Sequence, residues 1–390
     1  MSGHSPPSAQ ERIPGNGART LVVRLGSLGD IVHTLPAVAL LRDAVPGSID
    51  WVVEERWAEL LCSRRDLRGH NAPLCAEKPL VNTVHTVRTR DWRRHPFRVT
   101  TLREITASVA ALRSAHYDLA LDFQGAMRSA VLGKLAGPGR YFGFARAHEE
   151  PAGLFYNHRV EAQGRHMVEQ NISLALAVPG GTRQFSHPPM LPAELCFALP
   201  RDADDDAWAA DQLARLGICE FCLLNAGAGW GAKIWPATRW AEVARGLAGH
   251  GLRSVVNFGP SEENLARTVE RESGGAAVAV ASSISQLIAL ARRARLCVGG
   301  DTGPTHLAAA LGVPIVAIYG PTDPVRNGPF APGGARTAVT VLRSEWSITD
   351  HARHRRPEPG MLRITPGQVI AACRAALDGL NARCTNSRTE

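Results

Sequence analysis

The sequence contains no apolar run that approaches the ~20 residues needed to span a membrane. Aromatic residues make up only 6% of the 390 residues and charged residues 21%, against 45% hydrophobic residues, a balance typical of soluble globular proteins. Residues 1–18 are polar and contain no apolar segment of the signal-peptide type, so we expect a disordered tail. The rest of the chain is long enough for two domains.

Paired cysteines and metal-binding spacings are also missing. The eight cysteines are scattered, and several lie in apolar runs, which indicates reduced thiols in the cytosol. Cys219 and Cys222 have C-x-x-C spacing, but they run into a strand without a second pair, so a structural role is favoured over metal or redox chemistry. We find no zinc-finger spacing, RNA-binding signature or acidic D-x-D metal site, and we expect no nucleic acid, metal or other cofactor.

A formal net charge of +8 favours anionic partners such as phosphorylated sugars or an anionic membrane surface. Residues 88–98 alternate arginines with Trp92 and Phe97, and they form either a solvated face or a contact for a phosphate-bearing or membrane-surface partner. Residues 344–360 are basic and irregular. Their histidines have no acid or Cys at ligand spacing, so we expect a mobile solvated loop.

Strand-like apolar runs alternate with helical segments in both halves of the chain, which predicts parallel sheets with helices on each face. A segment rich in Pro and Gly between Val178 and Leu199 separates the halves. We therefore expect an N-terminal acceptor domain over residues 19–185, a C-terminal donor domain over 195–345 and a closing helix over 361–380.

The most informative stretch is Gly299 to Gly312. Two strands flank it, and a short apolar helix starts at Pro304, so Asp301, Thr302 and Gly303 lie where a strand turns into a helix. Free N–H groups and the helix dipole suit an anion there, most simply a diphosphate. The alternative is an ordinary turn with a capping Asp and Thr.

The first strand leads into a second turn of this kind, residues 26–30, which ends in Asp30. It is not the dinucleotide fingerprint G-x-G-x-x-G, which disfavours a nicotinamide-dependent oxidoreductase. Asp30 is either a helix cap or a base held at the ligand-binding edge of the sheet. Asp122, at the end of another strand, ranks second as a base.

The second half adds a Gly-rich loop at residues 227–231, then Lys233, which suits phosphate oxygens, and Glu262, which either accepts from a ribose diol or only serves a helix dipole. One carboxylate facing a nucleotide diphosphate fits an inverting sugar transfer. The base takes the acceptor's proton, and fixed donors stabilise the leaving diphosphate without a metal.

Five motifs resemble glycosyltransferase family 9, the heptosyltransferases of the lipopolysaccharide inner core. They span most of the chain in family order: LGSLGDIVHTLP (25–36), DFQG (122–125), AKIWP (232–236), DTGPTH (301–306) and YGPTDP (319–324). Residues 50–55 and 154–157 are more similar to heptosyltransferase I than to II, whereas the Gly-rich approach to Lys233 is more similar to II.

The resemblance implies a GT-B fold of two Rossmann-like domains, ADP-L-glycero-β-D-manno-heptose as donor and Kdo of Kdo-lipid A as acceptor. It also implies a cytoplasmic enzyme peripheral to the inner membrane, with Asp30 as general base. The donor-binding residues would be Ala228, Gly229, Lys233, Glu262, Ile284, Asp301, Thr302, Gly303 and His306. The acceptor-binding residues would be Arg93, Arg94, Gln124 and Arg128.

One departure from the family pattern concerns the donor. Where paired threonines would precede Lys233, this chain has Ala228 and Gly229, so backbone N–H groups would contact the phosphates instead. Two alternatives to heptosyltransferase I activity are transfer to a heptose acceptor, as by heptosyltransferase II, and a non-catalytic ADP-sugar-binding protein.

Overall fold

The computed structural model describes residues 17–64, 73–179, 195–332, 339–350, 352 and 354–386. Most of the predicted tail (residues 1–16) and most of the predicted linker (residues 180–194) lie outside the described residues. The described chain forms two six-stranded sheets, one in each half, and every strand pair in both is parallel.

The first sheet has the order β3-β2-β1-β4-β5-β6. Its strands are β1 (Ala18–Val23), β2 (Gly47–Glu54), β3 (Thr83–Val87), β4 (Leu119–Asp122), β5 (Arg140–Phe144) and β6 (His158–Val160). Its helices are α1 (Leu28–Val32), α2 (Leu35–Ala44), α3 (Thr89–Arg94), α4 (Val99–Ser114), α5 (Met127–Leu135) and α6 (Met167–Leu176), with 3₁₀ turns η1 (Glu55–Leu60) and η3 (Glu150–Phe155).

The second sheet has the order β12-β11-β10-β7-β8-β9. Its strands are β7 (Phe221–Asn225), β8 (Arg253–Phe258), β9 (Ala277–Ala281), β10 (Leu296–Gly300), β11 (Ile315–Tyr319) and β12 (Val339–Arg343). Its helices are α7 (Ala203–Arg215), α8 (Ala237–Ala248), α9 (Glu263–Glu272), α10 (Ile284–Arg293), α11 (Gly303–Ala310), α12 (Pro324–Asn327) and α13 (Pro366–Asn386), with 3₁₀ turns η4 (Gly231–Lys233) and η5 (Met361–Arg363).

The central strands are nearly continuous apolar runs because helices cover both faces of each sheet. All residues of β7, β10 and β11 are buried. The predicted parallel α/β organisation is thus confirmed. Two strands escaped prediction, β6 and β12, since these edge strands are half exposed and lack a long apolar run.

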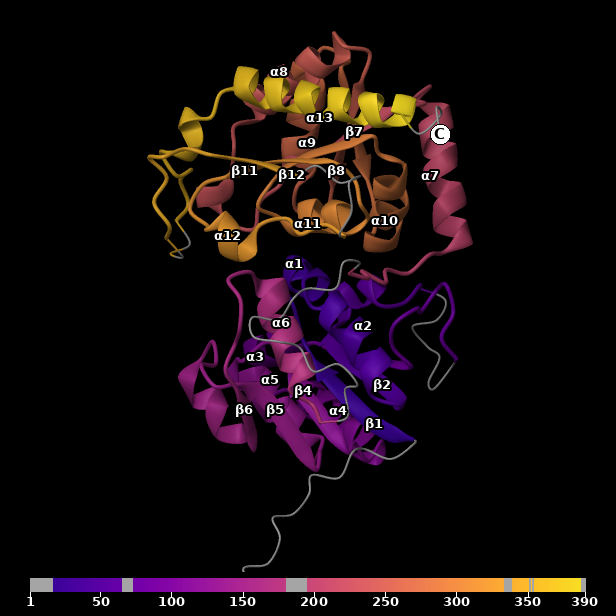
Figure 1. Ribbon diagram of the computed structural model, residues 1–390, viewed down its shortest axis with the longest axis vertical. Helices are drawn as coiled ribbons and strands as arrows, with labels where there is room; N and C mark the ends of the chain where they lie inside the picture. The colour runs from indigo at the N-terminus through magenta and orange to yellow at the C-terminus, as the bar shows by residue number, and fades with distance from the viewer. Residues whose placement is uncertain are drawn as a thin grey trace, which may run out of the picture.

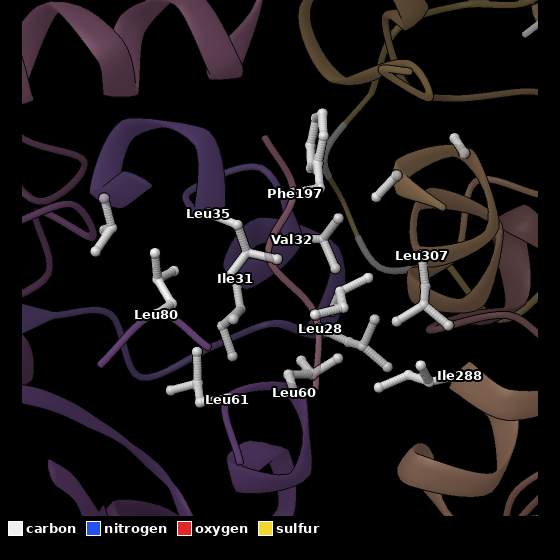
Figure 2. Packing of buried hydrophobic residues seen from close by; sticks show 14 of the residues in the cluster. Leu28, Ile31, Val32, Leu35, Leu60, Leu61, Leu80, Phe197, Ile288 and Leu307 are labelled. Atoms are coloured by element: carbon white, nitrogen blue, oxygen red, sulfur yellow. The ribbon is translucent and has the colours of Figure 1, made fainter. Parts of the chain in front are cut away.

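The two halves are stacked with α1 of the lower half facing α11 of the upper half, and α13 crosses the far side of the upper sheet (Figure 1). Both helices begin at the carboxyl edge of a central strand, so these edges face one another. Apolar side chains fill part of the junction, with Leu28, Val32 and Leu60 on one side and Ile288 and Leu307 on the other (Figure 2). Among the described residues, no helix is long and apolar enough to cross a membrane.

Candidate active site

Asp30 lies in the first turn of α1, directly across the junction from α11. One carboxylate oxygen accepts from the N–H and the hydroxyl of Ser27, both at 2.9 Å, so Asp30 completes a capping box. The other oxygen pairs with Arg24 Nη2 at 2.9 Å. The side chain still keeps 39% of its surface exposed. Asp30 therefore does cap its helix, as one reading of the sequence proposed, but it remains accessible to a substrate.

Two effects oppose each other at Asp30. Burial raises the pKa of its carboxyl, but Arg24, the Ser27 hydrogen bonds and the nearby His306 together outweigh burial and hold the pKa below its ordinary value of 3.8. Asp30 is consequently ionised at neutral pH. An ionised carboxylate can accept a proton.

Asp301 organises the opposite side of the junction. One of its oxygens accepts from Lys233 Nζ and from Thr322 Oγ1 (2.7 Å). The other pairs with His306 Nε2 at 3.1 Å and accepts from the Tyr319 hydroxyl at 3.3 Å. Burial raises the pKa of Asp301, but His306 and Lys233 lower it far more, so the carboxylate stays charged. The structure thus makes Asp301 the anchor of Lys233 and His306.

The start of α11 is open to a ligand. Thr302 is the N-cap, yet no side chain caps the first turn, so the Gly303 N–H keeps its hydrogen-bonding capacity. Leu28 of α1 lies so close to Gly303 that an added Cβ would stand 2.6 Å from Leu28 Cβ. A Cβ on Gly29 would likewise stand 2.7 Å from His306 Cδ2. These close approaches bring Asp30 and the α11 start into one site.

The other predicted donor residues line the same edge of the second sheet. Gly229 faces open space in the Gly-rich loop after β7, with the partly exposed Ala228 beside it. Glu262 lies against Gly227, and its Oε2 accepts from the Gly259 N–H at 3.3 Å. Ile284 begins α10 and is half-buried. The Gly-rich loop, Glu262 and α10 follow β7, β8 and β9, so all three lie at the carboxyl edge of the second sheet.

The Lys233 side chain is largely buried and already has partners within the protein. Its side chain is only 10% exposed. Its ammonium forms an ion pair with Asp301 and lies 4.0 Å from the centre of the Trp230 ring. The charge is therefore held at the base of the Gly-rich loop.

The described part of segment 344–360 is irregular and largely exposed, as expected of a solvated loop, but its backbone is bonded to the second domain. The Ala232 N–H donates to the His354 carbonyl at 3.0 Å, and the Glu358 N–H donates to the Ala232 carbonyl at 3.0 Å. The Asp350 N–H donates to the Pro321 carbonyl at 2.9 Å. The described part of this segment thus holds the end of the Gly-rich loop, at Ala232, through backbone hydrogen bonds. His351 and Arg353 lie outside the described residues.

The predicted acceptor residues divide into two groups. Arg128 belongs to a basic cluster with Arg56 and Arg90. Burial, Arg90 and Arg128 lower the pKa of Arg56, while Glu54 opposes them. Gln124 accepts from the Leu25 N–H at 2.9 Å and thereby supports the turn that leads to Asp30.

Arg93 and Arg94 form the second group. Both are exposed on α3, and neither side chain has any contact with Asp30 among those recorded for the described residues.

Asp122 is not a credible base. Its side chain is fully buried and accepts from the Ser129 and Tyr156 hydroxyls at 2.8 and 2.9 Å and from the N–H groups of Gln124 and Gly125. Burial raises the pKa of its carboxyl despite these bonds. Asp122 instead shapes the turn after β4.

Residues 202–206 contain a D-x-D pattern, and its aspartates lie at the start of α7. Asp202 is the N-cap of α7 and accepts from the Asp204 N–H at 2.8 Å. In the described part of the chain, no three His, Cys, Asp or Glu residues gather as a metal site. Cys222 is a buried free thiol and Cys219 an exposed one.

Sequence reasoning missed several partners of the site. Arg24 is buried at the end of β1 and holds Asp30, and its other terminal nitrogen donates to the Phe123 carbonyl. The sequence did contain a signal for this role, because Arg24 is a charged residue directly after the apolar strand of residues 20–23. Thr322 and Tyr319 belong to the YGPTDP motif, which by itself does not indicate that both donate to Asp301. Glu59 was not considered, although it contacts the other half of the molecule through Ser285.

Two parallel α/β domains whose carboxyl edges face one another, with a carboxylate on one side and an open helix start on the other, define the GT-B class of glycosyltransferases. The glycosyltransferase family 9 (heptosyltransferase) model matches residues 105–354. The chain belongs to this family and is a glycosyltransferase.

Its relatives include curated heptosyltransferases and solved structures. The chain is 32% identical to lipopolysaccharide heptosyltransferase 1 of Pseudomonas aeruginosa, over 80% of this chain and 81% of that protein. It is 31% identical to the protein of the same name in Escherichia coli K12, over 78% and 89%. The structure of E. coli heptosyltransferase WaaC with ADP superimposes with a TM-score of 0.70 at 27% identity, covering 92% of this chain and 99% of that one.

Proposed function

We propose that the protein is an inverting heptosyltransferase that moves L-glycero-D-manno-heptose from ADP-heptose to Kdo of Kdo-lipid A. The observation that carries the proposal is the placement of the ionised Asp30 carboxylate opposite the open start of α11, in a junction tight enough for Gly29 to approach His306. Relatives named heptosyltransferase 1, and the structure of E. coli heptosyltransferase WaaC with ADP-2-deoxy-2-fluoro heptose, support this donor.

The donor diphosphate would bind at the start of α11. The Gly303 N–H and the positive end of the helix dipole favour its charge, and backbone N–H groups of residues 228 and 229 take the place of side-chain hydroxyls. Lys233 adds a positive charge that Asp301 holds in place. Glu262 has a carboxylate suited to the ribose hydroxyls, and Ile284 offers an apolar contact for the adenine.

Asp30 would act as general base. As the acceptor hydroxyl oxygen bonds to the anomeric carbon of the heptose, its proton passes to Asp30, and the bond from that carbon to the ADP oxygen breaks. The N–H groups at the α11 start and Lys233 would stabilise the negative charge that develops on the departing ADP. Attack from the face opposite the leaving group inverts the anomeric centre.

The basic cluster of Arg56, Arg90 and Arg128 lies at the carboxyl edge of the first sheet, on elements that follow β2, β3 and β4. Arginine binds carboxylates and phosphates through paired N–H groups. The cluster therefore suits an acidic sugar such as Kdo, and Arg93 and Arg94 extend the positive surface along α3. We retain the division into an acceptor domain over 19–185 and a donor domain over 195–345 as part of this proposal.

A heptose acceptor is the second candidate. It is favoured by the Gly-rich approach to Lys233, which is more similar to heptosyltransferase II than to heptosyltransferase I. In either case the acceptor is lipid-linked, so we place the enzyme in the cytoplasm and on the inner face of the inner membrane.

The decisive experiment mixes purified protein with ADP-heptose and either Kdo-lipid A or its heptosylated product. Release of ADP with a mass increase of one heptose on Kdo-lipid A alone supports the proposal. Transfer only to the heptosylated lipid favours the second candidate. ADP binding with no transfer to either lipid contradicts both, and activity lost with EDTA and restored by magnesium contradicts the metal-free mechanism.

A further inference from the structure

Three large apolar side chains are exposed where α3 turns into α4. Phe97 is 93% exposed, Val99 62% and Leu102 53%. Single exposed apolar residues are common, but three so close together mark a contact surface. We refer to residues 95–103 as the α3–α4 corner.

Polar contacts fix the shape of this corner. Trp92 Nε1 donates to Glu104 Oε2 at 3.0 Å, and Arg88 pairs with the same carboxylate. These contacts fold α3 back on α4, so the turn between them projects outward. Along the whole of α4 only Thr101 and Leu112 are buried. The exposure of Phe97 therefore follows from a well-bonded arrangement of the two helices.

Positive charge surrounds the apolar side chains. Residues 88–104 contain six arginines and only two acidic residues. Both acids are already engaged, Asp91 beside Arg94 and Glu104 with Arg88. Arg93, Arg94, Arg98 and Arg103 are all exposed, which leaves a strong net positive charge around Phe97.

We propose that the α3–α4 corner is a docking surface for a lipid bilayer with anionic headgroups. Phe97, Val99 and Leu102 enter the boundary between headgroups and acyl chains, and the surrounding arginines contact lipid phosphates. A projecting corner with few apolar residues and many arginines fits a headgroup layer better than the recessed apolar surface of a protein partner. The positive charge of the arginines is complementary to the negative headgroups, which favours an anionic bilayer as the partner.

The proposal rests on the proposed function in one respect, the lipid-linked acceptor. The same helix α3 connects the corner to that chemistry, because Arg90 of the basic cluster is its second residue. Docking at the corner would hold the sheet edge with Asp30 close to the headgroup layer. A membrane-anchored sugar then has only a short distance to cover.

A sedimentation experiment tests the surface directly. Full-length protein is mixed with phosphatidylcholine vesicles with or without phosphatidylglycerol. We expect binding that requires the anionic lipid and falls at high salt. Phe97→Ser/Leu102→Ser and Arg98→Glu/Arg103→Glu should each lower vesicle affinity by roughly tenfold or more. The controls Leu135→Ser and Arg215→Glu, which change an exposed apolar residue and an exposed arginine elsewhere, should bind as the unchanged protein does.

Kinetics separate docking from catalysis. Phe97→Ser/Leu102→Ser should slow transfer to an acceptor in vesicles but not to a deacylated, water-soluble acceptor. The proposal is overturned if the corner variants bind vesicles as well as the controls do. It is also overturned if binding does not depend on anionic lipid, or if the corner binds another protein but no vesicles. If no transfer occurs with either acceptor, the proposed function fails, while the sedimentation result still decides the docking surface.

Discussion

Asp30 combines two roles that a single substitution can separate. Its carboxylate caps α1 through Ser27 and is the proposed base. Asp30→Asn keeps an oxygen that can accept from the Ser27 N–H but removes the basicity. We expect kcat to fall ~10²–10⁴-fold, the usual contribution of general-base catalysis.

The structure adds a cost in stability for Asp30→Asn, because Arg24 loses its ion partner. Loss of this charge-assisted bond should cost about 1.5–3 kcal/mol in the free energy of unfolding. Steady-state kinetics and thermal unfolding measure the two effects, with exposed Asp91→Asn as control. Near-normal kcat in Asp30→Asn would leave the residue as a cap and move the base elsewhere.

Arg24 acts on Asp30 through its charge, so its removal should appear in the pH profile. Since Arg24 favours the carboxylate form, the unchanged enzyme should lose kcat/KM only below the ordinary Asp pKa of 3.8. In Arg24→Met the pKa of Asp30 rises, and the acid limb should move to higher pH.

Arg24→Lys keeps the charge and should leave the limb near its original position. The measurement is kcat/KM as a function of pH for the three proteins. A uniform loss of rate with an unmoved limb would mean that Arg24 serves only the turn at Phe123.

At the scale of elements, the site depends on how the Gly-rich loop is tied to α11. Lys233 and Asp301 have side chains 10% and 9% exposed, and their ion pair joins the two elements. Lys233→Met leaves a buried carboxylate without its cation, which should cost about 3–5 kcal/mol of stability. Donor affinity should fall as well, because a positive charge near the diphosphate is lost.

A double variant separates these effects. Lys233→Met/Asp301→Asn removes both charges and should recover part of the lost stability without recovering ADP affinity. Exposed Lys134→Met is the control. Calorimetric titration with ADP and thermal unfolding give both quantities, and unchanged ADP affinity in Lys233→Met would exclude the lysine from the donor site.

The elements also show what the sequence can predict. The turns at Asp30 and Asp301 were found because apolar strands, glycines and short helices leave a local pattern. Thr322 and Glu59 escaped because their partners Asp301 and Ser285 lie 21 and 226 residues away, and only the packed chain brings them together. Arg24 lies close to Asp30 in sequence, but it continues an apolar strand and was taken as part of it. The described part of segment 344–360 is exposed as predicted, but its backbone bonds to Ala232 and Pro321 could not be read from its composition.

At the scale of the whole molecule, the two halves meet through apolar packing and through polar contacts. One of these places His166 Nε2 3.0 Å from the Gly328 carbonyl, and another lies between Glu59 and Ser285. Glu59 of η1 accepts from the Ser285 N–H at 3.0 Å and the Ser285 hydroxyl at 3.2 Å, at the start of α10. Burial raises the pKa of Glu59, but Ser285 and Arg64 lower it more, to below its ordinary 4.5. The contact joins the N-terminal half to the helix that begins with Ile284.

Glu59→Ala should therefore weaken closure of the two halves. Loss of these charge-assisted bonds costs about 1.5–3 kcal/mol. We expect a larger radius of gyration by solution X-ray scattering and a raised KM for the donor. Exposed Glu55→Ala, a change in the same 3₁₀ turn, should alter neither.

The pH dependence of closure supplies an independent check. A carboxyl whose pKa is lowered in the closed form stabilises that form above pH 4.5, and this contribution is lost as pH falls through the lowered pKa. The unchanged protein should thus expand on acidification below pH 4.5, whereas Glu59→Ala, already expanded, should change less. An identical radius for both proteins across this range would show that Glu59 does not hold the two halves together.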